Sequence, residues 1–179
     1  MHDEVFPQLV RTYYAGLYRF ALSLAKNSSD ACDLTQQTFF IWATKGHSLR
    51  DESKAKTWLF TTLYREFLRS RRRANRHTAV DDLSPEEQDF PDIEVDRVAK
   101  MDSQLVLEAL QEVDVVFREP LTLFYLQDHS YLEIAEVLAV PIGTVMSRLS
   151  RGKSQLRALL AQKARGGKVI EFPQSGIRS

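Results

Sequence analysis

An acidic stretch with two prolines divides the sequence, and it limits the possible folds more than any other feature. It spans residues 78–100, and its part up to residue 96 lacks the helical spacing of apolar side chains found on both sides. Elsewhere apolar residues recur every three or four positions, and no alternation typical of strands persists. We therefore predict an all-α protein with two small helical domains. The first domain covers residues 1–77 and the second covers residues 101–165. A linker at 78–100 joins them, and a C-terminal tail follows at 166–179.

The apolar periodicity also predicts where individual helices begin and end. Serine residues that can cap a helix N-terminus and a glycine at position 46 mark two of these ends. The expected helices cover residues 4–26, Ser28 or Ser29 to Lys45, 54–73, 97–114, 117–127, a short helix opened by Ser130, and about 142–162.

Composition excludes several classes of protein. The chain has 179 residues, of which 44% are hydrophobic, so at least part of it buries a core. No apolar run approaches the roughly 20 residues that span a bilayer, and the sequence begins without a basic and apolar leader. Cys32 is the only cysteine. These features predict a cytoplasmic protein without membrane insertion.

The sequence contains no pattern typical of catalysis or metal binding. The seven glycines form no phosphate-binding loop, and the four histidines are scattered along the chain. Cys32 has no partners at the spacing of a zinc site. We therefore expect neither an enzyme, nor a cofactor, nor a metal site.

Charge is segregated by sign, although the formal net charge of the whole chain is zero. Residues 65–77 carry a net +5 and residues 148–179 a net +7, whereas residues 78–104 carry −7 and residues 105–147 carry −6. Two basic patches held apart by an acidic middle indicate a polyanionic partner. The alternative is that these runs are ordinary solvated surfaces.

A helix-turn-helix pattern begins at Ser130. Ser130 and Glu133 have the spacing of a capping box, and Pro141 separates the short helix that they open from a longer, arginine-rich helix. Two helices joined by a tight turn are a common DNA-binding arrangement. An ordinary helical hairpin with a basic, hydrated back is the alternative.

A helical wheel divides the arginine-rich helix into two faces. The apolar face, expected to pack on the preceding helices, contains Ile142, Val145, Leu149, Gly152, Leu156, Leu159 and Leu160. The opposite face contains Thr144, Ser147, Arg151 and Ser154. From that face, Arg151 can form two hydrogen bonds with a guanine in the major groove. Basic residues on the flanks are expected to contact phosphates: Arg148, Lys153 and Arg157.

A second basic cluster lies at the end of the helix expected at 54–73. Its members, which follow several aromatic residues, are Arg69, Arg71, Arg72 and Arg73. The simplest explanation is that cations stabilise the C-terminal end of the helix dipole, with Trp58 and Phe67 in the core. Arginines beside exposed aromatic rings would instead suit single-stranded bases, which would give the chain two contacts with DNA.

Taken together, these segments resemble a bacterial RNA polymerase sigma factor of the sigma-70 family, of the compact extracytoplasmic-function (ECF) type. The resemblance covers about residues 8–162. In the first half it rests on three segments that resemble region 2 of the family, at 29–39, 49–53 and 57–60. In the second half it rests on three segments that resemble region 4, at 131–135, 141–145 and 147–151.

The resemblance implies a role for each region. Region 4 would face the polymerase β flap and bind the duplex −35 element of promoter DNA. The residues expected to bind this element are Thr144, Ser147, Arg148, Ser150, Arg151, Lys153 and Arg157. Region 2 would recognise and melt the −10 element, through Arg50, Asp51, Glu52, Ser53, Lys56, Arg65, Arg69, Arg71, Arg72 and Arg73. The β′ clamp of core RNA polymerase would bind Asp33, Gln36, Gln37 and Phe40. The acidic linker would extend toward the polymerase cleft.

Several positions depart from the family pattern. Cys32 and Gln37 stand where members usually carry acidic residues, so the clamp-binding helix lacks up to two negative charges. Met146 stands where a lysine or arginine is common. Weak unaided binding to polymerase would follow from the missing charges. Control could come from an anti-sigma factor, or from a kinase acting on threonines near this helix such as Thr35, Thr38 and Thr44.

The sequence therefore predicts a sigma factor that binds core RNA polymerase and directs promoter-specific transcription initiation. One alternative is a helix-turn-helix regulator that binds operators as a dimer without polymerase. The other is an interaction protein, a decoy that occupies polymerase or an anti-sigma factor without supporting transcription.

Overall fold

The computed structural model describes residues 5–46, 49–77 and 97–165, with side chains described for 5–46, 49–76 and 104–165. Within these ranges the chain is helical and contains no strand, which confirms the all-α prediction. The expected C-terminal tail and most of the expected linker lie outside the described residues. No described helix is both long enough and apolar enough to cross a bilayer.

Three helices form the first half of the structure. They are α1 (Val5–Ala25), α2 (Ser28–Lys45) and α3 (Ala55–His77), and they pack on one another. The short 3-10 turn η2 (Glu52–Lys54) leads into α3. The cap of α2 is Asn27, whose Oδ1 accepts a hydrogen bond from the backbone N–H of Asp30 at 2.7 Å. The expected cap at Ser28 or Ser29 was therefore wrong by one or two residues.

In the second half, residues 97–165 form four α-helices and one π-helical turn. The elements are α4 (Arg97–Glu112), α5 (Val115–Leu121), η3 (Thr122–Leu126), α6 (Tyr131–Leu138) and α7 (Ile142–Ala164). The single helix expected over 117–127 is thus two segments. Pro120 lies inside α5 and offers no N–H to the helical ladder, and the backbone changes to the wider π turn two residues later.

Two helix ends differ from the prediction at the edges of the linker. α3 continues to His77 instead of ending at Arg73, since neither proline nor glycine interrupts it there. α4 begins at Arg97, so residues 97–100 of the expected linker are helical. The arginine cluster therefore lies within α3 and not at its end.

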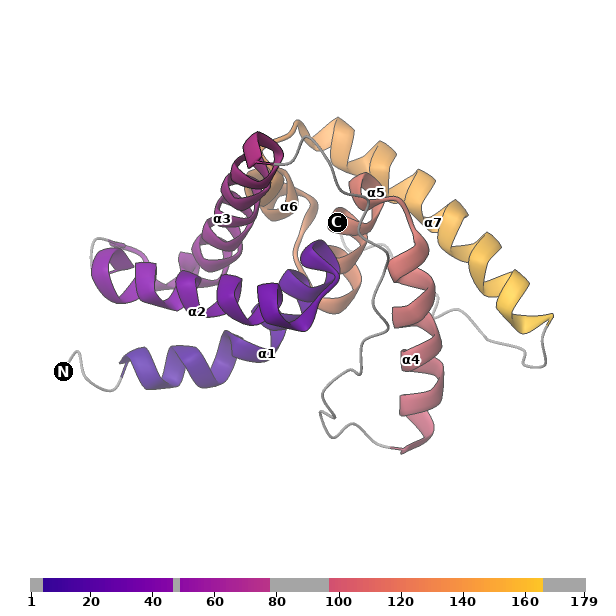
Figure 1. Cartoon of the computed structure of the whole chain (residues 1–179), viewed down its shortest axis with the longest axis horizontal. Coiled ribbons are helices and arrows are strands. Elements are labelled where there is room, and N and C mark those ends of the chain that lie inside the picture. The colour runs from indigo at the N-terminus through magenta and orange to yellow at the C-terminus, as the bar shows by residue number, and fades with distance from the viewer. Residues whose placement is uncertain (1–4, 47–48, 78–96, 166–179) are drawn as a thin grey trace.

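The two halves pack against each other (Figure 1). α3 contacts α6, and α1 contacts α5 and η3. At the centre of this contact the rings of Phe60 and His129, both buried, meet edge to face with centroids 4.6 Å apart. Phe60 also packs against Phe20 of α1. One hydrophobic core therefore runs through both halves.

Helices α5 and α7 come into close contact at Gly152. A Cβ atom added there would lie 2.8 Å from Cδ1 of Leu121 and 3.1 Å from Cβ of Phe117. Gly143, near the start of the same helix, has no atom within 4 Å of such a Cβ. Close packing therefore requires a glycine at position 152 and not at position 143.

Replacing these two glycines should change stability in opposite directions. We expect Gly152→Ala to lower the free energy of unfolding by about 1–3 kcal/mol, because the added methyl group overpacks the α5–α7 contact. Gly143→Ala should raise it by up to about 1 kcal/mol, because alanine has the higher helix propensity. Urea unfolding followed by circular dichroism measures both. Equal effects of the two substitutions would contradict the assigned packing.

The buried His129 should make the fold sensitive to acid. Burial, together with the nearby charge of Lys56, lowers the pKa of His129 to about 4. Below about pH 6.5 His129 becomes protonated in the unfolded chain but stays neutral in the folded chain. The free energy of unfolding is therefore highest above pH 6.5 and decreases as the pH falls toward 4. We expect a loss of about 2 kcal/mol between pH 7 and pH 5. Urea unfolding at both pH values should show a smaller loss for His129→Gln, and an equal loss would refute the assignment.

Candidate nucleic-acid interface

The predicted helix-turn-helix corresponds to α6 and α7, and local interactions fix its turn. The capping box is confirmed: Ser130 Oγ accepts from the N–H of Glu133 at 3.3 Å, and Glu133 Oε2 accepts from the N–H of Ser130 at 2.7 Å. α6 ends at Ala139, which adopts a left-handed backbone with φ of 53°. Pro141 then caps α7. These residues set α7 against α6 in the arrangement that lets a second helix enter a DNA groove.

The two faces of α7 largely agree with the wheel. The inner face is buried at Val145, Leu149, Gly152, Leu156 and Leu160, and half-buried at Leu159. Ile142 is an exception, because this first residue of the helix is 42% exposed. On the opposite face Ser147, Arg151 and Ser154 are exposed and Thr144 is half-buried.

The residues expected to bind the −35 element share this outward side of α7. Ser147, Ser150, Arg151 and Arg157 are exposed, and Thr144, Arg148 and Lys153 are half-buried. A shallow groove of about 320 Å³ runs between this surface and Tyr131 of α6. The Ser147 hydroxyl donates to the carbonyl of Thr144 at 3.1 Å. Arg151 is exposed and has no hydrogen bond or ion pair with any described residue.

The arginine cluster of α3 forms a second outward basic surface. Its exposed members are Arg65, Arg69, Arg71, Arg72, Arg73 and Arg76, and all of them except Arg71 line a groove of about 390 Å³. Because α3 extends to His77, Arg65 to Arg73 precede the last turn of the helix and Arg76 lies in it. Stabilisation of the helix dipole falls off within the last turn, so it accounts for Arg76 but not for the other members of the cluster.

The aromatic residues beside this cluster belong to the core. Tyr64 and Phe67 are buried, and Trp58 packs edge-on against Trp42 with centroids 5.0 Å apart. The guanidinium of Arg71 lies over the Phe67 ring, 5.7 Å from its centroid. The core interpretation is confirmed for Phe67, whereas Trp58 is half-buried. The buried rings of Tyr64 and Phe67 cannot stack on bases in this arrangement.

The polar loop before α3 carries the remaining residues expected to bind the −10 element. Arg50, Asp51, Glu52 and Ser53 are exposed. Asp51 Oδ1 accepts from the N–H and the hydroxyl of Ser53, at 3.0 and 2.6 Å, and these bonds lower the pKa of Asp51. Lys56 is different, because it lies in the first turn of α3 and its Nζ donates to the carbonyl of Gln127 in the second half.

The residues expected to bind polymerase form one exposed stripe on α2. Asp33, Gln36, Gln37 and Phe40 are all exposed, and their spacing of three and four places them on one helix face. The Phe40 side chain is 64% exposed. A large exposed aromatic ring beside polar groups is typical of a protein-binding surface.

The threonines considered as phosphorylation sites differ in accessibility. Thr35 and Thr38 are fully buried, and each donates its hydroxyl to the backbone carbonyl four residues earlier, at 2.7 Å. Thr44 is exposed. A kinase could therefore reach Thr44 in this structure, but not Thr35 or Thr38.

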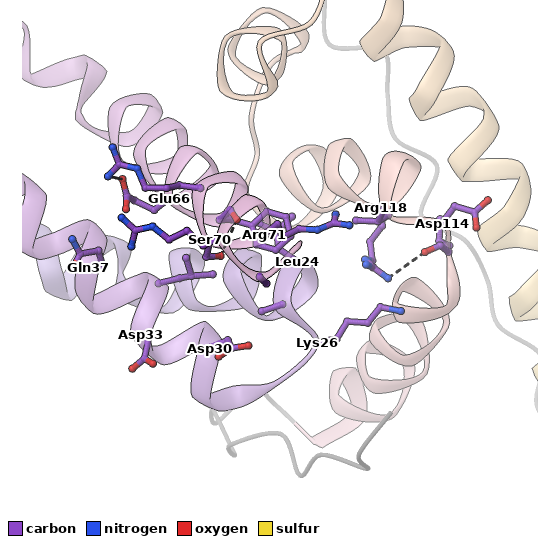
Figure 2. A pocket seen from close by; sticks show the side chains of 18 of the residues that line it. Leu24, Lys26, Asp30, Asp33, Gln37, Glu66, Ser70, Arg71, Asp114 and Arg118 are labelled. Atoms are coloured by element: carbon purple, nitrogen blue, oxygen red, sulfur yellow. Dashed lines mark hydrogen bonds and ion pairs between the residues drawn. The ribbon is translucent and has the colours of Figure 1, made fainter. Parts of the chain in front are cut away.

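A cleft of about 1070 Å³ opens between the two halves (Figure 2). It includes Asp33 and Gln37 of the α2 stripe and Arg71 of the basic cluster. Lys26 from the first half and Arg118 from the second point toward each other across it. Burial and the charge of Arg118 lower the pKa of Lys26. A molecule bound in this cleft would contact residues expected to bind polymerase and residues expected to bind the −10 element.

The described residues suggest no metal site. No group of three His, Cys, Asp or Glu side chains among them could hold a metal ion. His129 is buried between the halves, whereas the side chains of the other three histidines lie outside the described residues.

Three ionisable residues between the halves were not found by sequence reasoning. Tyr64 Oη donates to Glu119 Oε2 at 3.1 Å, and Glu119 is only 6% exposed. Burial raises the pKa of Glu119, while the bond from Tyr64 and the charge of Arg148 lower it. Arg118, also buried, donates to the carbonyls of Gln111 and Val113 at 2.8 and 3.2 Å. The signal in the sequence was the charged pair Arg118-Glu119 in an otherwise apolar helix.

Comparison with protein families matches both halves of the chain. Residues 9–77 match the family described as Sigma-70 region 2, and residues 103–156 match Sigma-70, region 4.

Curated relatives are similar over most of the chain. The ECF RNA polymerase sigma factor SigE of Mycolicibacterium smegmatis is 34% identical over 161 residues, which is 87% of this chain and 61% of that protein. The chain thus spans less than two thirds of SigE. The ECF RNA polymerase sigma factor SigM of Bacillus subtilis is 30% identical over 159 residues, which is 88% of this chain and 93% of that protein.

Two solved structures share the fold. The sigma factor RpoE of Bartonella quintana, in complex with the anti-sigma factor NepR, matches with a TM-score of 0.69 and 27% identity, over 88% of this chain and 98% of that chain. CnrH, in complex with the cytosolic domain of CnrY, matches in fold with a TM-score of 0.59 and 24% identity, over 88% of both chains.

Two exposed arginines of α7 should have different effects on duplex binding. We expect Arg151→Ala to lower the free energy of binding to the preferred duplex by about 1–3 kcal/mol, because a bidentate base contact is worth that much. The loss should depend on the base pair at one position only. Arg157→Ala, a matched control on the flank, should weaken binding to all sequences about equally. The measurement uses a duplex selected from random DNA and its single-base variants. A uniform loss for Arg151→Ala would identify it as a phosphate contact.

Neutralising the α3 cluster should change the salt dependence of DNA binding. For the triple variant with Arg71, Arg72 and Arg73 replaced by glutamine, each lost phosphate contact should lower the log–log salt slope by roughly 0.7–0.9. Arg11→Gln, on the exposed side of α1, should leave the slope unchanged. Titration of promoter DNA at several salt concentrations measures this. A triple variant with an unchanged slope and lower thermal stability would show that the cluster has only a structural role.

Proposed function

The chain belongs to the sigma-70 family of RNA polymerase sigma factors, within the ECF group, and from this premise we propose how its surfaces divide the work of transcription initiation. As a sigma factor it serves in promoter-specific initiation. The proposed division assigns promoter duplex to α7, the melted promoter strand to the loop before α3 and the arginines of α3, and core RNA polymerase to the α2 stripe.

The second half is proposed to bind the −35 element with α7 in the major groove. The exposed guanidinium of Arg151 supports this role, because a planar fork of donors matches the two acceptors of guanine. Arg148, Lys153 and Arg157 would bind phosphates on either side and fix the register of the helix. The same half would contact the β flap of polymerase.

The first half is proposed to hold the −10 element open. The six exposed arginines of α3 would follow the phosphates of this DNA, and the exposed loop from Arg50 to Ser53 would receive an unstacked base. The donors and acceptors of that loop, rather than the buried aromatic rings, would select the base. No step of this process requires a catalytic side chain, and the protein is proposed to act in the cytoplasm, where polymerase is found.

The α2 stripe is the observation that carries the proposal, because neither alternative accounts for all of the surfaces. A regulator that binds operators without polymerase has no use for a polar helix face with Phe40 64% exposed. A decoy that only occupies polymerase has no use for two outward arginine surfaces. The stripe would bind the β′ clamp, which sigma-70 factors contact through this region.

Run-off transcription separates the three functions. Purified full-length protein, core RNA polymerase from the same host and a promoter selected from random DNA by the two together should give a defined transcript. Duplex binding that needs no polymerase and yields no transcript would identify an operator-binding regulator. Polymerase binding without a transcript from any DNA would identify a decoy.

An anti-sigma factor is proposed as a further partner. One structural neighbour, RpoE, was solved in complex with the anti-sigma factor NepR. The other, CnrH, was solved in complex with the cytosolic domain of CnrY. The cleft between the halves supports this proposal, because a segment bound there would cover Asp33, Gln37 and Arg71 at once.

Restoring one negative charge to the α2 stripe should tighten polymerase binding. Asp33 is the acidic member of the stripe, and Gln37 is exposed beside it. We expect Gln37→Glu to increase affinity for core polymerase about 1.5- to 5-fold at low salt, since one exposed ion pair is worth about 0.2–1 kcal/mol. The gain should shrink at high salt because exposed pairs are screened. Gln104→Glu, exposed on α4, is the matched control, and equal titrations for both variants would rule out a limiting charge on the stripe.

A further inference from the structure

Met146 is an exposed apolar side chain that neither the core nor the proposed function uses. It is 53% exposed and lies in the second turn of α7, on the flank between the buried face and the face that carries Arg151. Its neighbour Ser147 and the next residue of the flank, Ser150, are polar and exposed. A methionine side chain has no donor to offer a phosphate or a base. Any contact that Met146 makes with DNA is therefore apolar.

The shallow groove beside α7 changes from apolar to cationic along the helix. Met146 lines it near the start of α7, and Lys153 and Arg157 line it about two and three turns later. The spacing of these positions, with Ser150 between them, places all four on one side of the helix. A polyanion laid along this groove would thus meet one apolar group before it meets the two cations.

Tyr131 gives the same groove a fixed wall on the α6 side. Its ring packs against Phe124 with centroids 5.3 Å apart. The capping box of Ser130 and Glu133 holds the backbone on either side of it. Methionine, in contrast, is unbranched and adapts its shape to a partner. One fixed wall and one adaptable wall suit a small apolar group that enters between them.

The major groove of DNA offers one apolar group, which is the C5 methyl of thymine. In a helix-turn-helix, the N-terminal residues of the second helix are those that contact base edges, and Met146 is the fifth residue of α7. The cations at the far end of the groove favour a partner with phosphates over an apolar protein surface. Promoter duplex is therefore the partner whose chemistry fits the whole groove.

We propose that Met146 is a specificity-determining residue, whose side chain contacts the methyl group of one thymine in the −35 element, at the apolar end of the groove between α7 and Tyr131. Arg151 and Met146 then read different chemistry, because a guanidinium selects hydrogen-bond acceptors and a thioether side chain selects a methyl group. This inference rests on the proposed function, since it needs α7 to lie in the major groove.

Removal of single methyl groups from the promoter tests this contact. Full-length protein and core RNA polymerase together select a promoter from random DNA, and 2′-deoxyuridine then replaces each thymidine of its −35 element in turn. This replacement removes the methyl group and leaves the hydrogen bonds of the base pair unchanged. We expect the affinity of the complex to fall about fourfold at one position, which is the value of one buried methyl group, and to stay unchanged at the others.

Variants of position 146 assign the lost affinity to one side chain. Met146→Ala should bind thymine and deoxyuridine promoters equally, with no loss of fold, because alanine is the best helix former at an exposed position. Met146→Leu keeps an apolar side chain of similar size and should retain the discrimination. Val116→Ala is the matched control, since Val116 is 44% exposed on α5, which packs against α7 at the buried Gly152. It should discriminate as the unaltered chain does.

The possible results separate this inference from the proposed function. An equal cost of deoxyuridine for Met146→Ala and the unaltered chain would overturn the inference and leave the proposed function intact. A selected −35 element without thymine would do the same. Weaker binding of Met146→Ala to core polymerase without DNA would assign the side chain to polymerase and overturn its role in reading DNA. Failure to select any promoter would contradict the proposed function, and the inference would fail with it.

Discussion

The packing of α3 against the segment from η3 to α6 determines the arrangement of everything else. It buries Phe60 against His129 and joins two helical groups into one core. The two halves also border the cleft, which is lined by residues of α2, α3 and the end of α4 (Figure 2).

The segregation of charge along the chain explains why two basic surfaces can coexist in a compact protein. Residues 65–77 and 148–179 carry net charges of +5 and +7, and direct contact between them would be repulsive. Glu119 faces Tyr64 and Arg71 of α3, and Glu133 lies near enough to Lys56 for that charge to lower its pKa. Arg151 and Arg157 of α7 and the six arginines of α3 remain exposed, and Arg148 is half-buried.

The sequence was sufficient for features that depend on local interactions. The capping box at Ser130 and the inner face of α7 follow from spacing alone, because a helix places every third and fourth residue on one side. The stripe of Asp33, Gln36, Gln37 and Phe40 was expected by resemblance, and its exposure agrees with that expectation.

Features that depend on contacts distant in sequence were not predicted. The packing of the two halves includes pairs such as Tyr64 with Glu119, which are 55 positions apart and have no periodic signature. The extension of α3 to His77 was missed because a run of arginines does not reveal where a helix ends. The π turn after Pro120 depends on how the backbone adjusts to a missing N–H, which composition does not specify.

The proposed binding of the α2 stripe to polymerase depends on two groups of different kinds. Phe40 is 64% exposed and would bury apolar surface on binding, whereas Asp33 would contribute an exposed ion pair that salt screens. A new negative charge on the exposed side of α2 would therefore change only the salt-dependent part of the affinity. Since one exposed ion pair is worth about 0.2–1 kcal/mol, a signal that acts through charge on α2 would change polymerase binding by a limited, graded amount.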